Sequence, residues 1–344
     1  MSPPWPRRST SSPSSERKKN AVIARRKTLA AAAALALGVA ASGAALAQSY
    51  PSRPIRIIAP YTPGSPNDVM VRLLTQPLQA KLGQPIVIDN RPGGGTSIGT
   101  KAAAMAAPDG YTLLYVSSSL VIDPAMKKVD YDPLKDFAPI ATVSTTSWLL
   151  AVSPTLPVKT LPQFVAYTKA NPGKVTLAYT QGTAAVLVGE KFKLLTGADI
   201  LSVPYKGGAA AMPDFLGGRI QMLIPTPSTT LPLIRDGRML ALAITSPTRS
   251  PNLPDVPTAS EVGLPELTLE FWAGILAPAS TPLEIVGALN DAINEVLQSP
   301  GMSASMDKLG FEAKIGTSTA FATFIAAEIP RWAEIVKSSG VKFD

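Results

Sequence analysis

Short apolar runs alternate along the chain with longer segments whose apolar residues recur at helical spacing. The apolar runs predict strands at 55–59, 86–88, 112–116, 149–152, 175–179, 201–203, 220–224 and 240–245. They are continuously apolar instead of alternating with polar residues, as expected of parallel strands buried on both faces. Strands that alternate with helices predict an α/β fold with mostly parallel sheets.

The segments between these runs carry helix start and stop signals. Apolar residues recur every four positions from Met70 to Leu82, and Gly83 follows where a C-cap glycine is expected. Residues 160–163 and 281–284 both have the spacing of a capping box. The last predicted helix covers about 319–338, with its apolar residues on one face.

The first 47 residues have the composition of an export signal. Residues 1–27 carry eight basic and one acidic residue, and residues 28–47 are uncharged and end in Ala45-Leu46-Ala47. A basic region, an apolar region and an A-x-A site predict a cleaved signal peptide, exported to the periplasm by the Sec or the twin-arginine route. Residues 1–47 carry a net charge of +7, so the chain without them has +1 of the total +8. The charge of the remaining chain therefore gives no reason to expect a nucleic-acid partner.

Cysteine and histidine are both absent from the chain. This excludes disulfides, thiolate or imidazole metal sites, Ser-His-Asp triads and Cys-His dyads. We expect no cofactor and no metal, while an all-carboxylate metal site and an enzyme that works through a pair of carboxylates stay open.

The loops after the predicted strands are the places where a parallel sheet binds ligands. The loop at 61–68 turns from a strand onto a helix N-terminus, which suits a carboxylate but is also an ordinary βα turn. The loop at 89–103 holds three consecutive glycines, yet matches neither a P-loop nor the dinucleotide fingerprint.

Three further loops offer hydrogen-bonding groups. Serines occupy 117–119, small polar residues occupy 180–183, and Tyr205 and Lys206 precede two glycines. None of these loops combines a nucleophile with a partnered base, so the chemistry on offer is reversible capture of an anion.

Several stretches are similar to those of the periplasmic substrate-binding proteins of tripartite tricarboxylate transporters, also called the Bug family. The matching stretches are YPSRPIRIIAPYTPGSPND, LGQPIVIDNRPGGGTSIGTKAAAMAAPDGYTLL, VPYKGGAAAMPDFLGGRIQMLI, RMLALAITSPTRSPNLPDVPTASEVGLPEL, FWAGILAPASTP and RWAEIVKSSGVK. They follow the family order over nearly all of the chain after residue 47.

The resemblance implies a two-lobed Venus flytrap fold, type II-like, with a cleft between the lobes. Lobe one would take residues 48–149 and 273–344, and lobe two would take residues 150–272. Family ligands are small carboxylates, including di- and tricarboxylates, acidic amino acids and aromatic acids. The implied partners are such a carboxylate and a membrane permease, and we expect a monomer.

The resemblance also assigns site residues. The carboxylate end would be formed by Tyr61, Pro63, Gly64, Ser65, Asn67 and Asp68, with Ser117, Ser118 and Ser119 beside them. Lobe two would contribute Gln181, Gly182, Thr183, Tyr205, Lys206 and Thr226.

The chain departs from the family pattern at three places. Ser65-Pro66-Asn67 replace the usual residues of the first loop, and Pro66 removes one N–H donor. The loop before Ala184 lacks the usual His, and Pro225 stands where the family often has Asp. The missing Asp argues against an amino-acid ligand and favours a longer or aromatic dicarboxylate.

Three classes of function remain open at this point. The leading one is a carboxylate-binding protein that delivers its ligand to a transporter. A sensor read by a membrane receptor would use the same cleft. A secreted enzyme would need a catalytic charged group, for which Asp68 and Lys206 are the candidates.

Overall fold

The computed structural model of this chain describes residues 50–180 and 183–340, together with Met1. Arg53–Asp344 forms one compact unit. Apart from Met1, the predicted signal peptide at 1–47 lies outside the described residues, so its cleavage stays a prediction. Among the helices that the structure describes, none is long and apolar enough to cross a membrane.

The first sheet has six strands in the order β11-β4-β10-β3-β1-β2. Their bounds are β1 (Ile55–Ala59), β2 (Ile86–Asn90), β3 (Thr112–Ser117), β4 (Phe137–Ser147), β10 (Glu270–Pro278) and β11 (Glu312–Ala313). Strand β1 pairs in parallel with β2 and β3, whereas β10 runs antiparallel to β3 and β4. The carboxyl ends of β1, β2 and β3 therefore meet at one edge, which brings their loops together.

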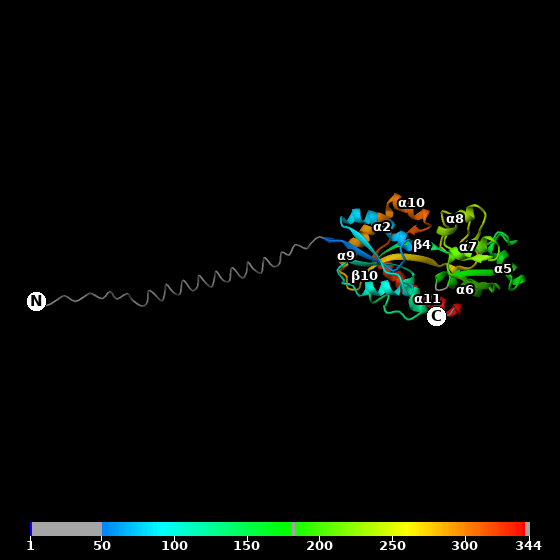
Figure 1. Cartoon of the computed structure of the whole chain (residues 1–344), viewed down its shortest axis with the longest axis horizontal. Coiled ribbons are helices and arrows are strands. Elements are labelled where there is room, and N and C mark those ends of the chain that lie inside the picture. The colour runs from blue at the N-terminus through cyan, green and yellow to red at the C-terminus, as the bar shows by residue number, and fades with distance from the viewer. Residues whose placement is uncertain (2–49, 181–182, 341–344) are drawn as a thin grey trace. The chain divides into compact units, whose positions relative to one another are not determined.

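Helices associated with the first sheet come from both ends of the chain. They are α2 (Pro66–Leu82), α3 (Ser97–Ala104), α4 (Ser119–Met126), α9 (Leu283–Gln298), α10 (Pro300–Lys308) and α11 (Ser318–Ser339), with a 3-10 turn η1 (Gly94–Thr96) before α3. Figure 1 shows α2, α9 and α10 beside β4 and β10. The C-terminal segment therefore completes the half of the molecule that the N-terminal segment begins.

The second sheet has five strands in the order β7-β6-β8-β5-β9. Their bounds are β5 (Leu149–Val152), β6 (Thr176–Thr180), β7 (Leu201–Tyr205), β8 (Met222–Leu223) and β9 (Leu240–Ile244). The accompanying helices are α5 (Leu161–Ala170), α6 (Ala184–Thr196), α7 (Gly208–Leu216) and α8 (Pro227–Arg235), with a 3-10 turn η2 (Pro265–Leu267). In Figure 1 these four helices gather at the second sheet.

The chain passes from the first sheet to the second at Trp148 and returns between β9 and β10. Trp148 N–H donates to Thr245 Oγ1 (3.0 Å), and Thr245 N–H donates to Trp148 O (2.9 Å). Thr245 Oγ1 in turn donates to Leu269 O (2.6 Å). The two crossings are thus tied to each other, as a two-lobed fold with a shared hinge requires.

The change of sheet at Trp148 and the start of β10 at Glu270 lie close to the predicted lobe limits. The lobe limits at 149/150 and 272/273 stay a prediction. Two sheets joined by two crossings give the architecture that the resemblance implied.

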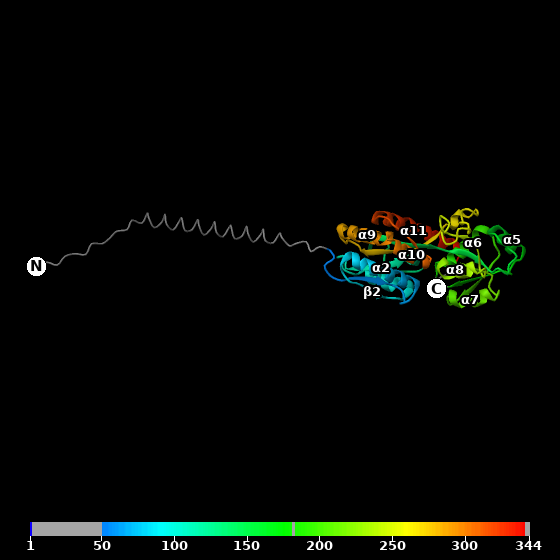
Figure 2. The same cartoon turned by 90° about the horizontal axis from the view of Figure 1, so that it is seen from above.

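The long C-terminal helix α11 packs against elements of both sheets. It contacts α4 and β4 on one side and α6 on the other, and Figure 2 shows it running between α9 and α6. Trp332 of α11 is fully buried and meets the Trp148 ring edge-on, with 6.3 Å between ring centroids. Its indole N–H donates to Glu328 Oε2 (2.8 Å). This helix therefore connects the two halves near the crossing strand.

Several predicted elements are confirmed at their residue limits. The strands at 55–59 and 149–152 match β1 and β5 exactly in extent, and Gly83 is the C-cap of α2 with φ +67°. Strands β4, β10 and β11 were not predicted. Prolines, glycine and hydroxyl residues interrupt β4 and β10, so their local pattern is not a clean apolar run.

The two predicted capping boxes have different outcomes. Thr160 Oγ1 accepts from Gln163 N–H (3.4 Å) at the start of α5, so the N-cap half of that box is confirmed. Gln163 Oε1 accepts from Lys159 N–H (2.8 Å) and not from Thr160 N–H, so the reciprocal half differs from the prediction. The box at 281–284 is wrong. Helix α9 begins at Leu283 with Pro282 as its N-cap, and Thr281 Oγ1 donates to Pro278 O (2.8 Å) instead.

Candidate functional site

Two neighbouring cavities lie where loops of the first sheet face helices of the second. The smaller, about 380 Å³, is called the polar cavity; its lining includes Tyr61, Ser65, Asn67, Thr96, Ser117, Ser119, Asp123, Thr183, Ala184 and Phe271. The larger, about 820 Å³, is called the apolar cavity; its lining includes Pro66, Tyr179, Ala185, Tyr205, Met212, Leu223, Ile224 and Pro225. Both cavities reach the N-terminal ends of α2 and α6. Ser65 and Ala184 line the polar cavity, and the next residues in the chain, Pro66 and Ala185, line the apolar cavity.

Tyr61, just after β1, provides a neutral hydroxyl at the polar cavity. Its oxygen accepts the backbone N–H of Ser117 (2.7 Å), and its ring packs edge-on against Tyr115. Burial raises the pKa of Tyr61 to about 12, so the phenol keeps its proton at neutral pH. The phenol can therefore donate a hydrogen bond to an anion.

The loop between β1 and α2 is fixed from within by Asp68. Gly64 adopts φ +80° and donates its N–H to Asp68 Oδ2 (2.8 Å), while Ser65 Oγ caps the helix by accepting from Asp68 N–H (3.3 Å). Arg72 Nε donates to Asp68 Oδ2 (2.9 Å) and Asn90 Nδ2 donates to Asp68 Oδ1 (2.8 Å).

Asp68 is 2% exposed and lines neither cavity. Burial raises its pKa, but hydrogen bonds from Arg72, Gly64 and Asn90 outweigh burial and hold the pKa below its usual value. The carboxylate is ionised and fully engaged, which leaves it to shape the loop and not to meet a ligand.

Hydroxyl groups from two other loops form a chain along the wall of the polar cavity. Ser117 Oγ lies 3.2 Å from Ser119 Oγ, which lies 3.1 Å from Thr96 Oγ1. Thr96 Oγ1 also lies 3.4 Å from Asp123 Oδ2. This wall combines the loop after β2 with the loop after β3, as the parallel pairing of β1 with both strands requires.

Asp123 and Thr96 are site residues that the sequence reasoning missed. Asp123 lies on α4, is 4% exposed and is 3.2 Å from Lys127 Nζ. Burial raises its pKa to about 6, although Lys127 pulls it down. The available signal was an Asp-Lys pair at i,i+4 directly after the serine loop, a pattern that more often marks a solvent-exposed helix face.

The predicted site residues separate into three groups. Those that line the polar cavity are Tyr61, Ser65, Asn67, Ser117, Ser119 and Thr183, and Tyr205 lines the apolar cavity. Those that line neither are Pro63, Gly64, Asp68, Ser118, Lys206 and Thr226. Gln181 and Gly182 lie outside the described residues.

Residues of the second group have other roles in the structure. Ser118 is buried and donates its N–H to Trp272 O (2.9 Å) at the start of α4. Thr226 precedes α8, where its carbonyl accepts from Thr230 Oγ1 (3.1 Å). Lys206 is exposed after β7. Direct contact of these residues with a ligand stays a prediction.

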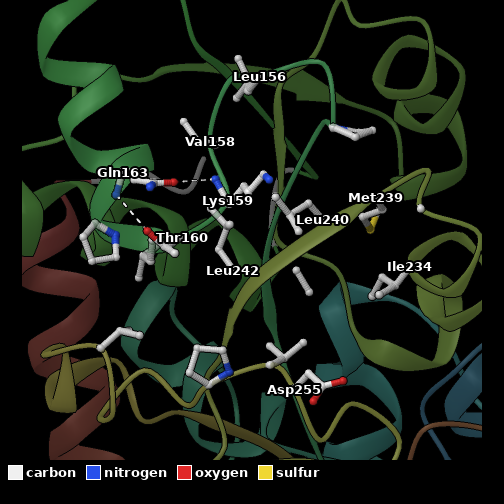
Figure 3. A pocket seen from close by; sticks show the side chains of 18 of the residues that line it. Leu156, Val158, Lys159, Thr160, Gln163, Ile234, Met239, Leu240, Leu242 and Asp255 are labelled. Carbon is white, nitrogen blue, oxygen red and sulfur yellow. Dashed lines mark hydrogen bonds between the residues drawn. The ribbon is translucent and has the colours of Figure 1, made fainter.

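A third cavity, of about 1330 Å³, lies elsewhere, beside the edge strand β9. Figure 3 shows Leu240 and Leu242 of β9 and Met239 at this cavity. On its other side, Gln163 Oε1 accepts a hydrogen bond from Lys159 N–H, and Gln163 N–H donates to Thr160 Oγ1. It shares no lining residue with the other two cavities and contains none of the predicted site residues. We call it the outer cavity.

The side chains of the described residues suit an anion better than a metal ion. No group of three or more Asp or Glu side chains within them could hold a metal ion. The polar cavity instead presents hydroxyl groups together with the N-terminal end of α6, marked by Thr183 and Ala184. A helix N-terminus and neutral donors suit an anion.

Comparison with known proteins decides the family. Residues 70–341 match the model described as the tripartite tricarboxylate transporter family receptor. The chain belongs to this family. It is 41% identical over 300 residues to the protein BugT of Bordetella pertussis, covering 86% of this chain and 92% of BugT.

Solved structures agree with this placement. The chain resembles R. palustris Rpa4515 with adipate at a TM-score of 0.73, with 31% identity and coverage of 85% of this chain and 99% of that one. It resembles MatC from Rhodopseudomonas palustris with bound malate at a TM-score of 0.68, with 29% identity and coverage of 83% and 100%.

Family membership confirms two of the expectations drawn from the sequence. The fold is the two-lobed α/β fold of periplasmic binding proteins. The chain is a solute-binding receptor and not an enzyme, so the role considered for Asp68 and Lys206 in catalysis is withdrawn.

Proposed function

We propose that this protein captures a small carboxylate in the cleft formed by the polar and apolar cavities and delivers it to a membrane permease. The observation that carries the proposal is the wall of neutral donors in the polar cavity. Tyr61, Ser117 and Ser119 face a helix N-terminus there, so a carboxylate would meet hydroxyl groups on one side and helix α6 on the other.

The apolar cavity favours a dicarboxylate with a carbon chain or a ring. Met212, Leu223 and Ile224 line it, and Pro225 stands where an acidic side chain would otherwise accept from an amine. One carboxylate in the polar cavity would place the remainder of the ligand against this apolar surface. The adipate and malate found with two family members are ligands of this class.

Location and partners follow from the same proposal. The predicted signal peptide at 1–47 would deliver the chain to the periplasm, where a monomer with two hinged lobes would close around its ligand. A membrane permease of the tripartite type would receive the closed form. A sensor that presents the closed form to a membrane receptor is the alternative use of the same cleft.

A ligand screen tests the proposal. The protein would be unfolded and refolded to remove carried-over ligand, then heated with C4–C8 dicarboxylates, citrate, aromatic acids, acidic amino acids, sugars and inorganic phosphate. A ligand at 100 times its Kd adds about 2.7 kcal/mol of stability, which gives a measurable rise in Tm. We expect dicarboxylates to raise Tm. A rise with sugars or phosphate alone, or with nothing, would remove the carboxylate assignment.

A further inference from the structure

A buried carboxyl group lines a cavity that is otherwise suited to an anion. Asp123 is 4% exposed and contributes to the polar cavity together with Tyr61, Ser117, Ser119 and Thr96. Two carboxylates in one small cavity repel each other, because little water is available to screen them. The presence of Asp123 therefore has to be reconciled with carboxylate binding.

The groups around Asp123 come from several elements. On α4 itself, Lys127 Nζ lies 3.2 Å from Asp123 Oδ2, and it also donates to Gly94 O (2.8 Å) in the loop after β2. Thr96 from that loop approaches the same Oδ2. The hydroxyl groups of Tyr61 after β1 and Tyr131 after α4 interact electrostatically with Asp123. Burial raises the pKa of both tyrosines, so both are neutral.

Two charged side chains on other elements packed against α4 pair with partners other than Asp123. Lys101 of α3 pairs with Asp130 (3.0 Å), and Glu328 of α11 pairs with Arg331 (3.1 Å). Lys127 is therefore the cation that faces Asp123 among the described residues.

The protonation state of Asp123 decides what the cavity wall can donate. Thr96 Oγ1 carries a single hydrogen, and an ionised Asp123 competes for it with Ser119 Oγ and with a ligand. A protonated Asp123 carries its own O–H donor, releases Thr96, and removes a negative charge from the wall. Each of these changes favours a bound carboxylate over an empty cavity.

We propose that Asp123 takes up one proton from solvent when a carboxylate enters the polar cavity, so that capture is coupled to pH. The inference rests on the proposed function of the cleft. The proton forms an O–H bond on one Asp123 oxygen, and no other covalent bond changes. Linkage then requires that a bound anion makes Asp123 easier to protonate and that a protonated Asp123 binds the anion more tightly.

The pH range follows from the environment of the group. Burial raises the pKa of Asp123 to about 6, so the carboxyl is mostly neutral below this pH and mostly ionised above it. Affinity for an ionised dicarboxylate should weaken by up to ~10-fold for each pH unit above 6.

The test is calorimetric titration of adipate and malate into protein expressed from the full chain, between pH 6 and 8. Ordinary carboxyl groups have pKa values of about 4, and the second carboxyl of a dicarboxylic acid ionises at a somewhat higher pH, so both ligands are dianions between pH 7 and 8, where the affinities are compared. Asp123→Asn is neutral at every pH, and Asp130→Asn changes an exposed Asp of the same region.

We expect the wild type and Asp130→Asn to lose up to ~10-fold in affinity between pH 7 and 8, whereas Asp123→Asn should have the same Kd throughout. Titration in buffers of different ionisation heat should show close to one proton taken up per ligand at pH 7 in the wild type and none in Asp123→Asn.

Lys127→Gln provides a second measurement that keeps Asp123 in place. Removing the neighbouring cation should move the midpoint of the pH dependence upward, whatever happens to the absolute affinity. A merely structural role for Asp123 would change affinity without moving this midpoint. The variant also keeps the inference testable if Asp123→Asn does not fold.

The outcomes separate this inference from the proposed function. Wild-type binding that is flat with pH, or that tightens as pH rises, overturns the role of Asp123 and leaves carboxylate capture intact. Absence of binding of adipate and malate at every pH, in the wild type and in Asp123→Asn, together with no rise in Tm for any carboxylate of the ligand screen, removes both proposals.

Discussion

Replacing Tyr61 by Phe tests two roles of its hydroxyl group, one in the stability of the fold and one in ligand binding. The substitution removes one oxygen and leaves the ring against Tyr115. That oxygen accepts the N–H of Ser117 at 2.7 Å, so its loss leaves a backbone donor without this partner at the end of β3. An unsatisfied buried donor costs about 1–3 kcal/mol. We expect the free energy of unfolding to fall by that amount.

The effect on ligand binding has a different origin. The phenol is neutral at pH 7, since burial raises the pKa of Tyr61 to about 12, and its hydrogen can be donated to a carboxylate. A hydrogen bond to a charged acceptor contributes about 1.5–3 kcal/mol, which corresponds to roughly 10- to 150-fold in Kd. Tyr61→Phe should therefore weaken dicarboxylate binding within this range.

The assay combines urea unfolding with calorimetric titration of the best ligand from the screen. Tyr167→Phe is the matched control, because Tyr167 is a half-buried tyrosine on α5 that lines neither the polar nor the apolar cavity. The control should keep wild-type affinity. A Tyr61→Phe variant that loses stability but binds within twofold of the wild type would refute the assignment of Tyr61 as a ligand donor.

Two further changes test the architecture around the cleft. Asp68→Asn should lower stability by about 2 kcal/mol at pH 7, because a buried acceptor of three hydrogen bonds loses its charge. The pKa of Asp68 is lowered in the folded state, so its contribution is present above its unfolded pKa and is lost as pH falls through the folded value. The difference between wild type and variant in urea unfolding should shrink at acid pH, and a constant difference would contradict this. Gly310→Ala should lower Tm more than Gly263→Ala. Both glycines have positive φ, so both substitutions strain the backbone. In addition, a Cβ at Gly310 would lie 2.4 Å from Ser228 N, whereas no atom beyond the neighbouring residues lies within 4 Å of a Cβ at Gly263. Equal losses of Tm would show that the contact between Gly310 and α8 is absent in solution.

The strand-to-loop part of the site could be predicted from local sequence. The apolar runs end at Ala59, which Pro60 and Tyr61 follow, and at Val116, which three serines follow, so Tyr61 and the serine loop were placed correctly at the carboxyl ends of β1 and β3. Parallel pairing of these strands then brings the two loops together. This step needs nothing beyond the apolar pattern.

Other parts of the site depend on packing between distant segments. Thr96 and Asp123 meet because α4 packs beside the 3-10 turn after β2, a contact between residues 27 positions apart. The local sequence around either residue does not predict this contact. The engagement of Asp68 by Asn90 is equally non-local, so an acid in the right loop was predicted as a ligand residue although its hydrogen bonds are satisfied within the fold.

The central strands of the first sheet show the same limit. Strand β10 lies between β3 and β4, with 9 residues and a register shift at Gly274. Gly274 is required there because a Cβ would lie 2.3 Å from the Phe321 ring. A glycine in a strand weakens the local signal, and its reason is the close approach of α11, which is far away in sequence.

The central claim is that one carboxylate binds in the cleft and nowhere else on the described surface. The most direct measurement is a titration that compares Ala184→Phe, which places a ring in the polar cavity, with Leu156→Phe, which places one in the outer cavity. Wild type and Leu156→Phe should bind one equivalent of a dicarboxylate with the same Kd, and Ala184→Phe should lose binding while keeping its fold by circular dichroism. Unchanged binding by Ala184→Phe, or loss of binding by Leu156→Phe, would contradict the account.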